Sequence, residues 1–216
     1  ADGSQGRPFT TIMTALNAAA GTETYPINIH VAEGVYSETV TMHAYENLYG
    51  GYRAVDWTRD VIAFPTIIDG EGERRCVEGA DCARLDGVVL LNGVADLGGG
   101  IYVPWGETGF TVANCVFRDC LADAGAGLYA VGSGRVVENC IFMSNAATYW
   151  GGALVGSDGA LSVMSSTIVG NVAPEGAGVC RYSGTVTVLN CILWDNVGTD
   201  LGGGATATYS CIEDGD

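Results

Sequence analysis

The sequence contains no lysine, so all nine of its basic residues are arginine, and they face 25 aspartate and glutamate residues. The resulting formal net charge of −16 disfavours nucleic acid and anionic membrane surfaces as partners. Two interpretations of the acidic surface stay open: it keeps the protein soluble, or it binds divalent cations. No apolar run reaches the roughly 18 residues that span a bilayer, and Ala1 opens on polar residues with no signal-peptide pattern. If the protein is exported, we expect this to be the mature form.

Zinc-type cysteine spacing is also missing. Eight cysteines form an even set, but no CxxC pair and no Cys/His zinc pattern occurs. Disulfides are therefore allowed in an oxidising compartment, and Cys76 with Cys82, in one polar loop, is the predicted bridge. The only histidines, His30 and His43, have no serine or cysteine motif beside them, which argues against a nucleophile–histidine arrangement.

No proline-rich, serine-rich or charged run divides the 216 residues, so we predict a single domain, 1–216. The 33 glycines, 48 % hydrophobic residues and only 16 % charged residues indicate short apolar strands joined by tight turns. This composition is typical of an all-β repeat protein.

Two motifs recur from about residue 86 onward. A small-residue turn that runs into a strand returns after 27, 25 and 26 residues, at 99–102, 126–129, 151–154 and 177–180. The second motif is Asn or Ser, followed by Cys or Ser, followed by apolar residues. It occurs at 114–117, 139–142, 165–168, 190–193 and 210–212. A period of about 25 residues with alternating polarity fits three short strands and three turns. We therefore predict a right-handed, single-stranded parallel β-helix with its coils in 27–216.

Equivalent residues of stacked coils form ladders along a solenoid. The first predicted ladder is a column of small side chains inside the coil: Cys115, Cys140, Ser166, Cys191 and Cys211. The alternative interpretation of this column is a metal or redox site. The second predicted ladder lies at a turn, where amides bond to each other and to the backbone: Cys120, Asn145, Asn171 and Asn196.

Residues 1–26 differ from the repeats. Apolar residues at helical spacing predict a helix over 9–20, with Gly21 as its stop. Because a solenoid exposes its core at each end, this helix is expected to cap the first coil. The alternating stretches 27–31 and 35–42 predict the strands of that coil.

These motifs resemble the pectin-lyase-like superfamily of right-handed β-helices. The N-terminal part of the chain looks like the opening of pectin methylesterases and of many surface proteins, at residues 2–4, 9–12, 15–19 and 31–38. Residues 48–52, 57–60 and 66–70 resemble bacterial surface proteins built of such repeats, and 142–145 with 151–154 are similar to polymorphic outer-membrane adhesins. The resemblance implies a secreted or cell-surface protein. The Gly-Gln-Asp-Thr, Asn-Thr-Asp and Gly-His-Gly segments of the family's esterases and hydrolases are absent from the chain.

Two residue sets are candidate ligand sites. Five aromatic residues near turns either stack against sugar rings or shield the coil: Trp105, Tyr149, Trp150, Tyr182 and Trp194. Four acidic residues near the C-terminus either bind Ca²⁺ or are solvated: Asp200, Glu213, Asp214 and Asp216. No other cofactor is expected.

We therefore expect a secreted or cell-surface structural or adhesive β-helix that assembles end to end, without catalysis. The alternative is a protein that binds or degrades polysaccharide on one wall of the helix. The partner of the last coil is either further coils of a longer chain or a second copy. The head-to-tail contact is predicted to join Phe9, Ile12 and Leu16 to Tyr209 and Ile212.

Overall fold

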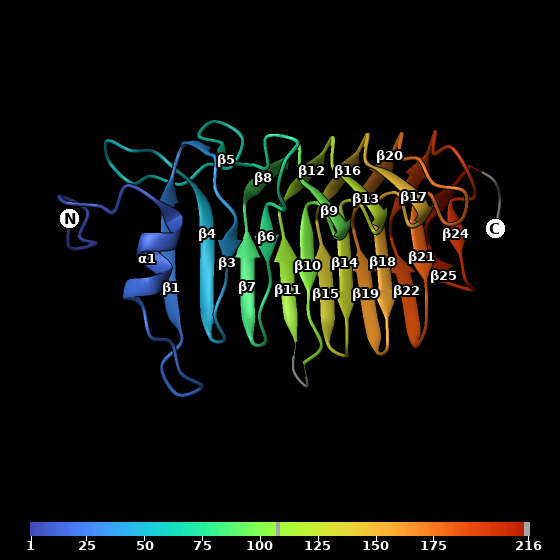
Figure 1. Cartoon of the computed structure of the whole chain (residues 1–216), viewed down its shortest axis with the longest axis horizontal. Coiled ribbons are helices and arrows are strands. Elements are labelled where there is room, and N and C mark those ends of the chain that lie inside the picture. The colour runs from blue at the N-terminus through green and yellow to red at the C-terminus, as the bar shows by residue number, and fades with distance from the viewer. Residues whose placement is uncertain (107–108, 214–216) are drawn as a thin grey trace.

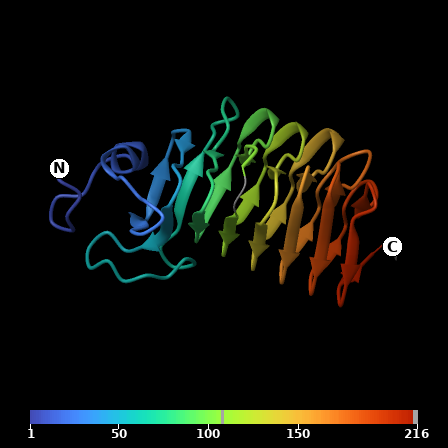
Figure 2. The ribbon, with the colours of Figure 1, turned by 90° about the horizontal axis from the view of Figure 1, so that it is seen from below.

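The computed structural model describes residues 1–106 and 109–213. The chain winds into a solenoid whose strands run in parallel ranks from the N-terminal to the C-terminal end (Figure 1). Each of the first seven coils contributes one strand to each of three sheets in turn, here named sheets I, II and III, and the last described coil contributes strands to sheets I and II. Seen from below, the rod is gently curved, with the short helix at its N-terminal end (Figure 2). The predicted parallel β-helix with about 25 residues per coil is confirmed.

Sheet I consists of β1 (Ile27–Ala32), β4 (Glu46–Tyr52), β7 (Ala83–Asp86), β11 (Phe110–Ala113), β15 (Arg135–Glu138), β19 (Ala160–Met164), β22 (Thr185–Leu189) and β25 (Thr206–Thr208). Sheet II consists of β2 (Gly34–Tyr36), β5 (Thr66–Asp69), β8 (Val88–Leu91), β12 (Val116–Arg118), β16 (Ile141–Met143), β20 (Thr167–Val169), β23 (Ile192–Trp194) and β26 (Cys211–Ile212). Sheet III consists of β3 (Val40–Thr41), β6 (Val77–Glu78), β10 (Ile101–Val103), β14 (Leu128–Val131), β18 (Leu154–Ser157), β21 (Val179–Arg181) and β24 (Leu201–Gly202). A short fourth sheet, between sheets II and III, consists of β9 (Val94–Leu97), β13 (Leu121–Ala124) and β17 (Ala146–Trp150).

The core is a set of ladders because the strands pair in strict register. On sheet II, Phe117 pairs with Phe142, and their rings stack with centroids 4.2 Å apart at 9°. Leu90 and Ile168 extend the same buried column on either side. Burying each of these side chains contributes roughly 2 kcal/mol, so the column holds successive coils at one spacing.

The helix α1 spans Ile12–Ala18, which is shorter than the predicted 9–20. The Thr11 side chain accepts a hydrogen bond from the Thr14 amide, and the Glu38 carboxylate accepts from the amides of Ile12 and Met13. These caps fix the start of the helix three residues later than predicted. Ile12 and Leu16 are buried against the first coil, so the predicted capping role is confirmed.

The turn between sheets I and II explains the recurring Asn of the second motif. Asn114, Asn139 and Asn190 each adopt a left-handed backbone, with φ of 53°, 51° and 55°. Asparagine tolerates this conformation better than other residues with a Cβ. A single residue therefore turns the chain from one sheet to the next.

The residue after this turn points inward and forms the predicted column. Cys115, Cys140, Ser166 and Cys191 are buried one above another, and the Ser166 hydroxyl accepts from the Cys140 amide at 3.1 Å. The prediction for Cys211 is wrong.

In the last coil Tyr209 takes the left-handed turn position, with φ 52°. Ser210 therefore continues the column, and its hydroxyl accepts from the Cys191 amide. Cys211 pairs with Ile192 instead and is exposed. A shift of one residue moves a strand side chain to the opposite face.

The second predicted ladder is confirmed. The Asn145 carbonyl oxygen accepts from the Cys120 amide at 3.1 Å, and its amide nitrogen donates to Phe117 O and to Asn171 Oδ1. Asn171 repeats the arrangement with Asn196. Both Asn145 and Asn171 are fully buried. Each amide thus satisfies backbone groups of the preceding coil and bonds to the side-chain amide of the next coil.

The predicted disulfide between Cys76 and Cys82 is not formed. Neither of them is in a disulfide, and neither are the other six cysteines. Strand β6 separates the two: Cys76 is buried inside the coil, where its Sγ donates to Leu91 O at 3.3 Å, whereas Cys82 lies beside Tyr45. The short spacing in sequence therefore does not bring the two sulfurs together.

Replacing a ladder amide should destabilise the fold strongly. We expect Asn145→Ala to lower the free energy of unfolding by about 2–4 kcal/mol, because the buried Cys120 amide loses its acceptor and Phe117 O and Asn171 Oδ1 each lose a donor. Asn47→Ala, which removes one exposed amide contact with Asn28, should cost no more than about 0.5 kcal/mol. Urea unfolding measures both; equal losses in the two variants would contradict the role of the ladder.

Candidate functional site

The outer face of sheet III carries a column of residues from successive coils. Register places Glu78, Tyr102, Tyr129, Val155 and Cys180 side by side along it. The rings of Tyr102 and Tyr129 stack with centroids 6.1 Å apart. The two tyrosines occupy the fourth position of the small-residue motif at 99–102 and 126–129, a repetition that could have revealed this column from the sequence.

Three of the five predicted aromatic residues converge beside this column. The ring centroid of Trp150, at the end of β17, lies 5.6 Å from those of Tyr149 and Tyr182. All three side chains remain substantially exposed, at 38 %, 53 % and 60 % respectively. Large aromatic side chains that cluster while exposed are unusual on a folded surface, which makes this cluster a candidate binding surface.

The aromatic cluster borders a hollow of about 230 Å³. Its lining combines aromatic, charged and small residues: Trp150, Glu175, Cys180, Arg181, Tyr182 and Gly203. The turn after Trp150 depends on Gly151, whose φ is 62° and whose missing Cβ would lie 2.3 Å from Val155. A side chain there would push β17 away from sheet III and separate Trp150 from Tyr182.

The other two predicted aromatic residues are elsewhere. Trp105 follows β10 in the turn toward sheet I, and Trp194 ends β23 on sheet II. Both are exposed. Neither contributes to the hollow, so the predicted set of five divides into one cluster and two separate residues.

Two arginines on the sheet III side differ from the rest. Within the described residues, seven of the nine arginines form ion pairs with carboxylates, whereas Arg75 and Arg181 form none. Arg75 lies over the Tyr102 ring at 5.0 Å and donates to two backbone carbonyls. Arg181 donates to Gly203 O at 2.6 Å and to Gly184 O. The two cations stand four coils apart, roughly 19 Å, with the tyrosine column between them.

The thiol in the floor of the hollow is not an activated nucleophile. Burial, together with the nearby Glu175 carboxylate, raises the pKa of Cys180 to about 11. The thiolate is the reactive form of cysteine, so this thiol is inert at neutral pH. Both histidines lie near the N-terminal end of the chain, and neither lines the hollow.

A second polar cluster lies on the outer face of sheet I and was not predicted. The Asp86 carboxylate accepts hydrogen bonds from Arg59, Arg84 and Asn114, and Arg84 also pairs with Glu138 at 3.0 Å. Arg59 comes from the loop after β4. Two carboxylates and two arginines therefore meet on one parallel sheet.

This cluster is neutralised internally. Burial raises the pKa of Asp86, but the hydrogen bonds from Arg59, Asn114 and Arg84 outweigh burial and lower the pKa below its usual value. A general acid needs a pKa near the working pH, so Asp86 is suited to holding the Arg59 loop on the sheet and not to proton transfer.

Of the predicted Ca²⁺ ligands, Asp200 and Glu213 are described, and their carboxylates have other partners. Asp200 is buried and bonds through its two oxygens to Asn196 Nδ2 and the Glu213 amide. The Glu213 carboxylate accepts from the Asp195 amide instead of facing Asp200. Asp214 and Asp216 lie outside the described residues. No group of three or more potential metal ligands occurs among 1–106 and 109–213.

The predicted subunit contact is only partly accessible. Ile12 and Leu16 are buried in the chain's own core, so their prediction as contact residues is wrong: they are already covered as parts of the cap. Phe9 and Ile212 are half-buried, and Tyr209 is 90 % exposed. None of the described helices is long and apolar enough to cross a membrane.

Residues 80–214 match the family model described as the right-handed beta helix region. The chain belongs to this right-handed β-helix family. Among solved structures, it is similar to the pectin methylesterase from Aspergillus niger in its deglycosylated form, with 15 % identity and a TM-score of 0.47. That alignment covers 96 % of this chain and 83 % of the other. A likeness this distant says nothing of activity. No curated protein sequence matches the chain.

The Asp86 cluster predicts a dependence of stability on pH. Because the pKa of Asp86 is lowered in the folded state, its contribution is present above the unfolded pKa of about 3.9 and is lost as the pH falls through the folded pKa. We expect Asp86→Asn to lower the free energy of unfolding by about 2 kcal/mol at pH 7. The difference from the original protein should shrink progressively as the pH falls below about 4.

Urea unfolding at pH 7 and at low pH measures this difference. Asp123→Asn is the matched control, because Asp123 is exposed on β13 and no ion pair or side-chain hydrogen bond reaches its carboxylate within the described residues. An Asp86→Asn effect that stays constant over the acid range would contradict the assigned ion pairs.

Proposed function

We propose that this chain is an extracellular adhesive module: a rigid β-helix whose aromatic cluster on sheet III binds glycan chains without cleaving them. The observation that carries the proposal is the exposed group of Tyr149, Trp150 and Tyr182 beside a hollow. Flat aromatic rings bind the apolar faces of sugar rings, and neighbouring polar groups bind their hydroxyls. Arg181 and Glu175 stand at the hollow in that role.

The exposed part of the site is confined to the aromatic cluster. Of the column on sheet III, Tyr129, Val155 and Cys180 are buried, and only Tyr102 is half-buried. Arg75 and Arg181 provide guanidinium groups that no carboxylate of the described chain neutralises. We therefore place the glycan on the exposed rings of Tyr149, Trp150 and Tyr182, beside Arg181.

The polar chemistry of the site favours binding over cleavage. Hydrolysis of a glycosidic bond uses two carboxyl groups at a defined separation, one with a raised pKa. The carboxylates that meet on sheet I are held by Arg59 and Arg84, and the Cys180 thiol stays protonated at neutral pH. We accordingly propose a secreted or cell-surface protein with a structural or adhesive role and no hydrolase, lyase or esterase activity.

A glycan array followed by calorimetry tests the proposal. We expect Trp150→Ala and Tyr182→Ala each to weaken binding of the identified oligosaccharide at least tenfold, which corresponds to about 1.4 kcal/mol. Trp194→Ala, an exposed aromatic residue on another sheet, should leave affinity unchanged. A reducing-sugar assay on the bound glycan should detect no cleavage. Binding that survives both cluster variants, or turnover abolished by a single Asp substitution, would contradict the proposal.

The end of the last described coil favours a second role in assembly. Strand β25 pairs only with β22, and Ala207 and Ile212 remain half-buried at the edge of the core. We propose that a further coil or a second copy covers this end, with Tyr209 in the contact and with Phe9 in place of the buried Ile12 and Leu16.

Light scattering tests the assembly role. Self-association of the 216-residue chain should increase with concentration, and Tyr209→Lys should reduce it by placing a charge in the contact. A chain that stays monomeric at high concentration would rule out the second copy as partner.

A further inference from the structure

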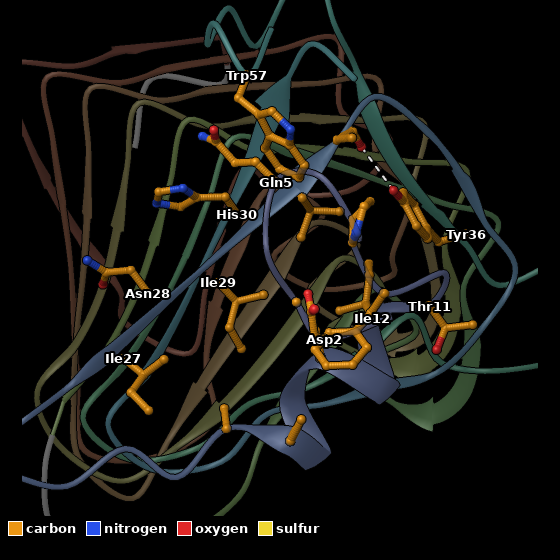
Figure 3. A pocket seen from close by; sticks show the side chains of 18 of the residues that line it. Asp2, Gln5, Thr11, Ile12, Ile27, Asn28, Ile29, His30, Tyr36 and Trp57 are labelled. Carbon is orange, nitrogen blue, oxygen red and sulfur yellow. Dashed lines mark hydrogen bonds between the residues drawn. The ribbon is translucent and has the colours of Figure 1, made fainter. Parts of the chain in front are cut away.

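A cavity lies at the opposite end of the rod from β25, away from the aromatic cluster. It has a volume of about 590 Å³ and is open on one side. Figure 3 shows Ile27, Asn28, Ile29 and His30 along one wall, with Trp57 and Gln5 at the top and Tyr36 at one side. Every residue of β1 lines the cavity, so the hollow follows the whole strand.

Strand β1 is the first strand of sheet I and pairs only with β4. The Ile27 amide donates to Tyr45 O, which sets the alternation of the parallel ladder. The backbone N–H and C=O groups of Ile29 therefore also point toward β4. Those of Asn28 and His30 point the other way, to the free edge. No further hydrogen bond reaches these backbone groups from the described part of the chain.

Helix α1 forms the facing wall and leaves space beside that edge. It presents small side chains to the cavity, namely Ala15, Ala18 and Ala19. The helix buries Ile12 and Leu16 in the core but does not occupy the edge of the strand. The result is a slot with a row of unpaired backbone groups on one side and a shallow apolar surface on the other.

The lining of the slot carries little net charge of its own. It contains one carboxylate, Asp2, which pairs with Arg7 at 3.4 Å, and no arginine. Burial and the nearby Arg59 cation lower the pKa of His30, so its imidazole is uncharged at neutral pH. The preference for a cationic partner therefore comes from the net charge of −16 on the whole chain.

We propose that this slot binds an extended, cationic peptide segment of a partner protein, which adds to the free edge of β1 as a further strand of sheet I. Only a polypeptide offers N–H and C=O groups at the two-residue spacing of Asn28 and His30. Its inward side chains must be small and apolar to fit against Ala15 and Ala19. Its outward side chains lie beside His30 and Trp57.

The binding test uses a synthetic probe, acetyl-Lys-Thr-Val-Thr-Ala-Thr-Val-Lys-amide. We expect a dissociation constant below about 1 mM at low salt and several-fold weaker binding when glutamate replaces the two lysines. Two N-methylated forms of the probe, methylated on alternate residues, remove the hydrogen bonds of one edge or of the other. One form should bind like the parent and the other at least tenfold more weakly. Absence of binding, or equal affinity of all three forms, would overturn the proposal.

Protein variants test the edge itself. Asn28→Pro removes an N–H that β4 does not use, so it should abolish peptide binding while the fold persists. Asn28→Ala, which keeps that N–H, should bind within about twofold of the original chain. Amide exchange gives a readout that does not depend on the variants: binding should slow exchange at Asn28 and His30 at least tenfold and leave Ile29 unchanged. Unaltered exchange at both positions with peptide bound would place the peptide elsewhere and overturn the proposal.

Discussion

Backbone pairing between consecutive coils is the interaction on which the rest of this structure depends. Each sheet is a parallel ladder in which every coil satisfies half of the hydrogen-bonding groups of the next. Parallel pairing alone leaves register open to slippage, and the buried amides of Asn145 and Asn171 bond across coils at one position only. The ladder therefore fixes register, and register in turn stacks Phe117 on Phe142 inside and Tyr102 on Tyr129 outside.

The same constraint accounts for where chemistry can appear. A β-helix buries every inward position, so functional groups are confined to outward columns, turns and the two ends. On sheet III the outward column meets the short fourth sheet, and this brings Trp150 against Tyr182. On sheet I the outward arginines and carboxylates neutralise one another. At the first coil, the solenoid leaves a strand edge beside a helix that covers only the core.

Periodicity predicted the architecture because each coil repeats the same residue types at its turns and in its columns. The Asn-Cys motif encoded both the left-handed turn at Asn114 and the buried column that begins at Cys115. The prediction failed where the repeat changed length: the last coil is shortened, so Ser210 and not Cys211 continues the column. Side-chain contacts between coils could not be predicted either. Arg59 lies in an irregular loop, so the repeat gives no indication that it pairs with Asp86.

The candidate site was predictable only in part for a related reason. Exposed aromatic residues near turns could be named individually, but the fourth sheet that gathers Tyr149, Trp150 and Tyr182 has no distinct signature in the repeat. The described members of the predicted Ca²⁺ set, Asp200 and Glu213, show what proximity in sequence leaves open. Proximity in sequence suggested a cluster, whereas the Asp200 carboxylate is directed at Asn196 and the Glu213 backbone.

The four tryptophans provide the most direct test of glycan binding at sheet III. Their indole N–H groups give separate signals in a nitrogen-resolved NMR spectrum of the labelled protein. Titration with the oligosaccharide chosen from the array should shift the Trp150 signal and leave those of Trp57, Trp105 and Trp194 in place. A titration that moves Trp105 or Trp194 while Trp150 stays fixed would contradict the account.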